Sequence, residues 1–175
     1  EEYCKETENR MVEALFVSAG IGAVIAENAS IAGASGGCQA EIGSASAMAA
    51  GGLAYLQGGD AECIANAAAF ALKNMLGLTC DPVCGLVEVP CIKRNSAGAV
   101  NAAVSAQMAM AGIKSAIPAD EVIDSMRRIG NALPAALRET SEGGLAVTES
   151  ARKIAERMGK KEHIAKKTRE SNENQ

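Results

Sequence analysis

Six cysteines are the residues of this 175-residue sequence best suited to chemistry. Cys80, Cys84 and Cys91 fall within twelve positions, and Cys38 follows the glycine-rich segment 33–37. In a reducing compartment such thiols rarely form disulfides, so they are packing residues, reactive thiols or metal ligands. Thiolates are preferred ligands of zinc and of iron–sulfur clusters. The C-x3-C-x6-C spacing matches neither zinc ribbons nor bacterial ferredoxins, so spacing alone leaves a metal site and buried structural cysteines equally open.

The remaining cysteines and the only histidine are predicted to take no part in the chemistry. Cys63 falls inside an alanine-rich helical pattern and Cys4 near the amino end, which favours packing or surface positions. His163 lies in a run of charged residues, where we expect a solvent-exposed side chain. No side chain therefore stands out as a general base, and the catalytic base is left unassigned.

Helical patterning dominates the segments that must position these cysteines. The sequence holds 35 Ala and 18 Gly, and so many small side chains indicate helices packed closely together. Apolar residues recur at helical spacing, and no segment alternates as a strand would. Asn95 is expected to cap the fourth helix and Pro118 to open the fifth. We expect six helices, at 6–26, 41–57, 61–76, 95–111, from 118 onward and at 145–160.

Two irregular segments interrupt the helices and carry the clustered cysteines. One covers 32–38, and the other, 78–91, contains two prolines and Gly85, which prevent a regular helix. The sequence thus predicts an all-α fold, a compact Ala/Gly-rich domain with cysteine-bearing loops between its helices. We place this helical domain at 1–150 and a charged helix end and tail at 151–175.

Composition and charge argue against several kinds of partner. Aromatic residues make up 2% of the chain, with no Trp, so nucleic-acid bases would find no stacking surface. The net charge is −4, although 151–175 holds eight Lys and Arg against four Asp and Glu, a mixture typical of a solvated tail. The apolar stretch 15–26 is expected to be too short for a bilayer span. We see no secretory leader and expect a cytoplasmic protein with no membrane and no nucleic-acid partner.

Three longer motifs resemble those of the iron–sulfur-dependent L-serine dehydratases. They are SGGCQAEIG at 35–43, GLTCDPVCGLVEVPCIKRN at 77–95 and RETSEGGLA at 138–146. The resemblance runs from about residue 10 to 150 and is to the C-terminal part of the α chain, or catalytic domain, of that family. It implies that the domain at 1–150 is the C-terminal portion of an iron–sulfur catalytic domain.

The resemblance implies a [4Fe–4S] cluster bound by Cys38, Cys80 and Cys91. Cys84 is not a fixed feature of the family, so it is expected to be a small packing residue. Single-chain relatives end with a further cysteine, whereas this sequence ends Ser-Asn-Glu-Asn-Gln and resembles the two-chain type. Three thiolates for four irons leave one iron open to oxygen ligands, as in aconitase, where it acts as a Lewis acid.

The implied reaction is the deamination of L-serine to pyruvate and ammonia by dehydration, without pyridoxal phosphate. The resemblance also implies a β chain or domain, which supplies some acid–base and carboxylate-binding groups, and an oligomeric enzyme. Within this sequence, Arg94 offers bidentate geometry for the substrate carboxylate. The full set of candidates for that contact, directly after Cys91, is Lys93, Arg94, Asn95 and Ser96. An equal alternative is that Asn95 and Ser96 only cap the next helix.

Other residues of the motifs are expected to support the cluster ligands. Gln39 and Glu41 come just after Cys38 and could orient it through hydrogen bonds. Arg138 and Glu139 could equally form an ion pair with a purely structural role. We expect the segment 86–89 and the alanine-rich helices to form a dry wall around the cluster.

Three other functions are compatible with the same residues. A related family of cysteine desulfidases uses the same kind of cluster domain, and its reaction would release sulfide. A non-catalytic redox module would carry a cluster held by four thiolates, which the assignment of three ligands disfavours. A helical domain without a cluster, awaiting its partner, is the remaining alternative.

Overall fold

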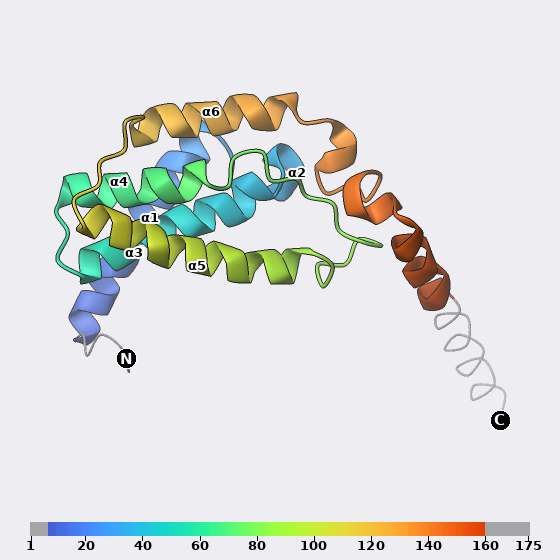
Figure 1. The fold of residues 1–175 in the computed structure, drawn as a ribbon, viewed down its shortest axis with the longest axis horizontal. Helices are drawn as coiled ribbons and strands as arrows, with labels where there is room; N and C mark the ends of the chain where they lie inside the picture. Colours follow the sequence, from blue (N-terminus) through green and yellow to red (C-terminus); the bar gives the residue numbers. More distant parts are fainter. Residues whose placement is uncertain (1–6, 160–175) are drawn as a thin grey trace.

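The structure is a computed structural model that describes residues 7–159, and helices form most of it (Figure 1). The long helices are α1 (Glu8–Asn28), α3 (Ser44–Leu56), α4 (Ala61–Lys73), α5 (Cys91–Met110) and α6 (Ala119–Ala132). The short ones are α2 (Gly33–Gly36), the π-helical turn η1 (Gln39–Gly43), and the 3-10 turns η2 (Ala135–Leu137) and η3 (Gly144–Val147), with a last helix at 149–159. The described residues contain two isolated bridges and no strand. The prediction of an all-α fold is confirmed.

Helix α3 is the centre of the fold, because it packs against α1, α4 and α5. Its inward-facing residues are very small, and Ala47, Ala50 and Ala54 are completely buried. Where α1 crosses α3, a Cβ atom on Gly52 would stand 2.5 Å from Ser18 Oγ. The helices therefore approach closely because glycine and alanine occupy the crossing points, as the composition predicted.

Larger side chains fill the space around this alanine-rich centre. Ile25 of α1, Leu72 of α4 and Val122 and Met126 of α6 are all at most 2% exposed and belong to one cluster. Burial of each such side chain contributes about 1.5–3 kcal/mol to folding. This core holds α1, α4 and α6 around α3, and the chain segments that carry the cysteines leave from the ends of these helices.

The predicted helices are present, but several boundaries differ from those expected. The helix expected at 41–57 is observed as two elements: the π-helical turn η1 (Gln39–Gly43), followed directly by α3 (Ser44–Leu56). The segment 61–76 is helical only as far as Lys73. The segment 145–160 starts with η3, and its regular helix begins at 149. Helical spacing in the sequence does not distinguish a π or 3-10 turn from an α-helix, which is why these breaks were missed.

Helix α1 packs on α3 with one face and exposes an apolar opposite face. Gly22 and Ile25 are buried against the core, whereas Leu15 and Phe16 are 68% and 74% exposed. With 21 residues, α1 is long and apolar enough to cross a membrane, contrary to the length expected from 15–26 alone. Core helices of soluble proteins and signal sequences pass the same test, and only 17% of this window is buried. The expectation that no membrane partner exists stays a prediction.

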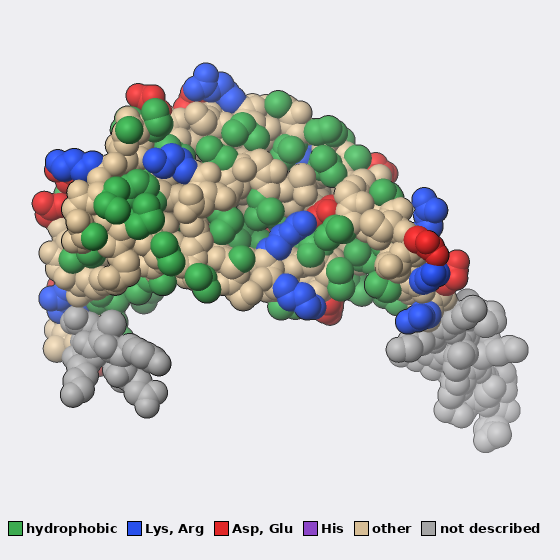
Figure 2. Space-filling view, viewed as in Figure 1, with side chains coloured by type: hydrophobic (Ala, Val, Ile, Leu, Met, Phe, Trp, Pro, Cys, Tyr) green, Lys and Arg blue, Asp and Glu red, His purple; other side chains and the backbone are tan. Residues whose placement is uncertain are grey.

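Lys and Arg side chains are scattered over the face of the molecule seen in Figure 2 and do not gather into one patch. Proteins that bind nucleic acids concentrate basic side chains along one surface to neutralise phosphates. This face offers no such surface. The expectation of no nucleic-acid partner stays a prediction.

Replacing Gly52 by Ala is expected to lower the free energy of unfolding by about 1–3 kcal/mol. The added methyl group would meet Ser18 Oγ at 2.5 Å and the backbone oxygen of Ala14 at 3.2 Å. The matched control is Gly20→Ala in α1, where nothing lies within 4 Å of the added atom. That change is expected to raise stability by about 0.5–1 kcal/mol through helix propensity. Urea unfolding measures both, and a Gly52→Ala protein at least as stable as the parent would refute the close crossing.

Candidate metal centre

The three predicted ligands lie close together in the structure. The Sγ atoms of Cys38, Cys80 and Cys91 all lie within 4.8 Å of one another. The three residues are 0%, 2% and 4% exposed, respectively. They come from the start of η1, from the loop between α4 and α5, and from the first residue of α5. Residues far apart in the sequence therefore form one buried group of three thiols, and their role as cluster ligands stays a prediction.

The position of Cys38 depends on the residues on either side of it. Gly37 has a φ of 77°, a left-handed conformation that favours glycine, and a Cβ atom there would stand 2.8 Å from the backbone oxygen of Leu78. Gln39 is completely buried, and its amide donates to Met126 O at 3.0 Å while accepting from Gly77 N at 2.9 Å. The Gln39 side chain thus links η1 to α6 and to the loop that leads to Cys80. These contacts are to Met126 and Gly77 and not to Cys38 itself, so the expected support of Cys38 by Gln39 stays a prediction.

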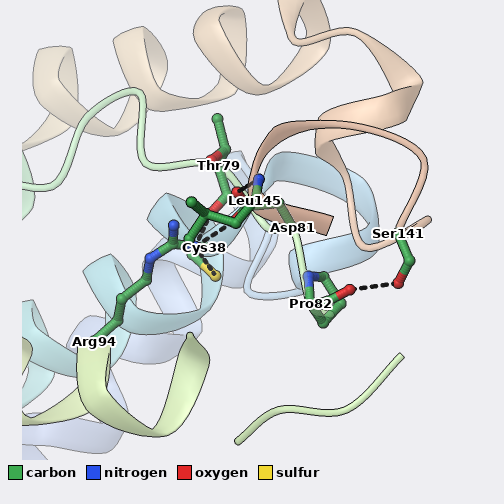
Figure 3. A network of polar contacts seen from close by, with 7 residues as sticks. All are labelled: Cys38, Thr79, Asp81, Pro82, Arg94, Ser141 and Leu145. Carbon is green, nitrogen blue, oxygen red and sulfur yellow. Dashed lines mark hydrogen bonds and ion pairs between the residues drawn. The ribbon is translucent and has the colours of Figure 1, made fainter. Parts of the chain in front are cut away.

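Backbone pairing with the third sequence motif holds Cys80 in place. Cys80 N donates to Leu137 O at 2.9 Å, and Glu139 N donates to Cys80 O at 2.7 Å. Further along the same loop, Ser141 Oγ donates to Pro82 O at 2.6 Å (Figure 3). The motif at 138–146 and the preceding Leu137 therefore hold the cysteine loop in place through hydrogen bonds.

Cys91 begins α5 directly after Pro90, a residue that lacks an N–H and is tolerated at a helix start. Asn95 Nδ2 donates to Cys91 O at 3.0 Å, and Ser96 Oγ donates to Lys93 O at 2.6 Å. The prediction that Asn95 caps this helix is wrong, because the helix starts one turn earlier. Neither side chain caps the helix; both bond back to carbonyls of the preceding turn.

Arg94 connects the thiols to a buried carboxylate, as Figure 3 shows. Its Nη1 donates to Asp81 Oδ1 at 2.7 Å and to Thr79 O at 2.8 Å, and it lies 4.0 Å from Cys38 Sγ. Asp81 is 3% exposed, and its other oxygen accepts from Leu145 N at 2.7 Å. Asp81 was not predicted to take part in this site, although its position directly after Cys80 could have indicated it.

Burial favours the protonated form of two of these thiols, Cys38 and Cys80. Removal from water raises the pKa of Cys38 to about 11, against the opposing influence of hydrogen bonds from Cys80 and Arg94. Burial and the neighbouring Cys38 also raise the pKa of Cys80. Thiols in such surroundings are inert as nucleophiles at neutral pH, and binding a metal must displace their protons.

The other cysteines lie apart from this group, with one departure from expectation. Cys84 is exposed with a φ of 57°, so the prediction that it is a packing residue is wrong; the turn around Gly85 carries it outward. Cys63 is partly buried, packs on the core and places its Sγ 3.5 Å from Met110 Sδ, as predicted. Cys4 and His163 lie outside the described residues.

The expected wall around the thiols differs from the one observed. Leu86, Val87 and Val89 are 40%, 52% and 38% exposed, so the segment 86–89 does not shield the thiols. Short turns throughout this segment point its side chains outward. Ile42 of η1 is instead packed against the three cysteines and is 1% exposed.

The absence of a side chain at Gly33 keeps its Cβ position beside the thiols unfilled. Gly33 faces the thiols, and a Cβ atom there would stand 3.2 Å from Cys80 Sγ. Three buried thiols that converge from separate segments are the donor set that zinc and iron–sulfur clusters require. The residues present therefore fit a thiolate-bound metal or cluster.

A compact helical domain with three converging buried thiols defines a recognisable class, the all-α proteins with a buried cysteine group that could hold a metal ion. Comparison with known proteins identifies the particular family. Residues 1–146 match the family described as serine dehydratase alpha chain, and the chain belongs to this family.

The most similar proteins include three alpha chains. The "Probable L-serine dehydratase, alpha chain" of Bacillus subtilis is 57% identical over 152 residues, 87% of this chain and 51% of that protein. The protein of the same name from Latilactobacillus sakei is 58% identical over 134 residues, 77% of this chain and 64% of that protein. The "L-serine dehydratase, alpha chain" of Peptoniphilus asaccharolyticus is 52% identical over 139 residues, 79% and 48% of the two chains. The present chain thus spans about half to two thirds of the length of these relatives.

Replacing Cys38, Cys80 or Cys91 by Ser is expected to remove most of the iron from anaerobically prepared protein, because each change deletes one of the three convergent ligands. Cys84→Ser and Cys63→Ser are the matched controls and should retain it. Iron and inorganic sulfide analysis of each variant provides the measurement. Loss of iron from Cys84→Ser together with its retention in Cys38→Ser would overturn the assignment.

The affinity of the metal-free protein for Co²⁺, a spectroscopic substitute for zinc, is expected to rise with pH. Each thiol that is protonated in the free protein releases its proton on binding, so affinity rises by up to about tenfold per pH unit for each such thiol. The rise ends only above the pKa of the free thiols, about 11 for Cys38. Absorption titrations across neutral to alkaline pH measure the slope, and an affinity independent of pH would contradict burial of the thiols.

Proposed function

We propose that this chain carries the [4Fe–4S] centre of a lyase that deaminates L-serine to pyruvate and ammonia. The observation that carries the proposal is the convergence of Cys38, Cys80 and Cys91 in a chain of the serine dehydratase alpha chain family. The names of the similar alpha chains support the same reaction and substrate. Neither the sequence nor the described residues offer a binding motif for pyridoxal phosphate, so we propose that the enzyme works without it.

Three thiolates are the appropriate number for a catalytic cluster of this kind. A [4Fe–4S] cluster held by three protein ligands supplies a Lewis acid that helps the serine hydroxyl leave. Electron-transfer clusters have four thiolate ligands, and the described residues bring only three together. The number of thiols therefore favours a lyase over a redox module.

The residues of this chain have separate roles in the proposed enzyme. Cys38, Cys80 and Cys91 hold the cluster, and their burial excludes water from it. Arg94 lies 4.0 Å from Cys38 Sγ and can stabilise its negative charge once the proton has left.

The substrate carboxylate is proposed to contact the first turns of α5. Asn95 and Ser96 are exposed there, and the Arg94 side chain is 20% exposed. Because Arg94 Nη1 is already bonded to Asp81 and Thr79, only its remaining N–H groups are available to a substrate. Asn95 would complete the contact through the second N–H of its side-chain amide, and Ser96 would do so by turning its hydroxyl away from Lys93 O.

A second chain is proposed to complete the enzyme. The alpha chain label of the family supports a β chain or domain as partner, with an oligomeric and cytoplasmic assembly. No histidine falls within the described residues, and no side chain there has the geometry of an evident general base. We therefore assign the base to the remainder of the complete enzyme.

Anaerobic reconstitution followed by a serine titration tests the proposed function. The complete enzyme is expected to bind about four iron and four sulfide per chain of this type, and L-serine is expected to change the cluster spectrum. Release of pyruvate and ammonia with no sulfide from added L-cysteine would distinguish the enzyme from a desulfidase. A protein that takes up zinc but never iron and sulfide would refute the proposal.

The reconstituted 175-residue chain alone is expected to release no pyruvate from L-serine. The chain spans about half to two thirds of its relatives and lacks an evident base among its described residues. Supplying the rest of the alpha chain together with the β chain should restore turnover, which a coupled assay for pyruvate measures. Turnover by the reconstituted chain without any partner would contradict this expectation.

A further inference from the structure

The carboxylates of Glu41 and Glu139 lie close to Gly33, next to the thiol of Cys80. The distances are measured from the position that a Cβ atom of Gly33 would occupy. That position is 3.2 Å from Cys80 Sγ, 3.3 Å from Glu41 Oε2 and 3.5 Å from Glu139 Oε2. The backbone of Gly33 is thus surrounded by one ligand thiol and two carboxylate oxygens.

Both carboxylates are placed there by unusual backbone conformations. Glu41 lies in η1, the π-helical turn that follows Cys38, and such single turns occur frequently at functional sites. Glu139 has a φ of 67°, in the left-handed region, and its N–H donates to Cys80 O. A non-glycine residue in this conformation costs free energy, and such residues cluster at active sites.

These two carboxylates place negative charge beside Gly33 and Cys80, on one side of the centre. Both side chains belong to exposed residues, and neither has an ion-pair or hydrogen-bond partner within residues 7–159. Arg138, the neighbour of Glu139, donates to Ser35 O instead of forming the ion pair that the sequence suggested. The nearby guanidinium of Arg94 is already paired with Asp81. A cation is therefore the group that this side of the centre accommodates best.

A small groove gives access to Glu41. It lies between α1 and the segment formed by η1 and α3, has a volume of about 390 Å³, and is lined mainly by small apolar residues. Its two polar residues are Glu41 and Ser44. Ser44 is 2% exposed, and its Oγ has no hydrogen-bond partner in the described part of the chain. A buried hydroxyl without a partner is costly unless a ligand supplies the hydrogen bond.

We propose that Glu41 and Glu139 bind the α-ammonium group of the amino-acid substrate. The inference rests on the function proposed above and specifies how the site selects its substrate. Serine carries one ammonium and one carboxylate, and the two Glu side chains attract the first and repel the second. The substrate carboxylate therefore points away from them, and a hydroxy acid of the same shape, which lacks the ammonium group, is disfavoured.

The test compares two ligands that differ at this group alone. L-Serine and L-glycerate are titrated into the complete cluster-loaded enzyme, and binding is followed by calorimetry and by the cluster spectrum. Glu41→Gln and Glu139→Gln are each expected to weaken serine binding about tenfold, and the double variant about 100-fold. Binding of glycerate should stay the same or strengthen, because repulsion of its carboxylate is relieved.

Three controls accompany the comparison. Iron and sulfide contents of the variants should equal those of the parent, since neither carboxylate is a ligand in this proposal. Glu41→Asp keeps the charge and should bind serine more tightly than Glu41→Gln does. Glu121→Gln removes an exposed charge from the first turn of α6 and should change neither affinity.

Two results would overturn the inference. Equal loss of serine and glycerate binding in the Gln variants would mean that the carboxylates act only on the shape of the site. Unchanged serine binding in the double variant would mean that they do not contact the ammonium group. Failure of the proposed function is distinct, because then the parent enzyme itself would show no response to serine.

Discussion

The ion pair between Arg94 and Asp81 is the interaction on which the rest of the centre depends. Asp81 comes directly after Cys80 in the chain, and Arg94 comes three positions after Cys91. The second carboxylate oxygen of Asp81 accepts a hydrogen bond from Leu145 N in the third motif. A buried carboxylate without these partners would be strongly unfavourable, and breaking such a pair costs about 3–5 kcal/mol. Because the carboxylate must keep its partners, the cysteine loop, the start of α5 and the third motif have to stay together.

The thiols impose a second constraint on the same region. Burial raises the pKa of Cys38 and of Cys80, and the three sulfur atoms lie within 4.8 Å of one another. A bound metal or cluster replaces the protons and turns the same burial into protection from water. Arg94 lies beside Cys38, where its positive charge offsets the thiolate that then forms.

The close packing of the helices keeps these irregular segments in register. Alanine and glycine at the crossings of α3 bring α1, α4 and α5 near enough for their ends to hold one site. Gly98 of α5 illustrates how little space separates the helices, since a Cβ atom there would stand 2.8 Å from Ile42, the residue packed against the three cysteines. A change in helix spacing would therefore move the thiols as well.

The sequence by itself determined the helical fold and the identity of the three convergent cysteines. Helical periodicity is local, and the motifs around Cys38, Cys80 and Cys91 are long enough to identify a family. Only the tertiary structure decided that Asp81 pairs with Arg94, that Cys84 is exposed, and that the segment 86–89 does not cover the site. It also decided that two carboxylates approach Gly33, one of them on a π-helical turn. The physical reason is that burial and charge pairing depend on contacts between segments far apart in the chain, which residue spacing along one segment does not specify.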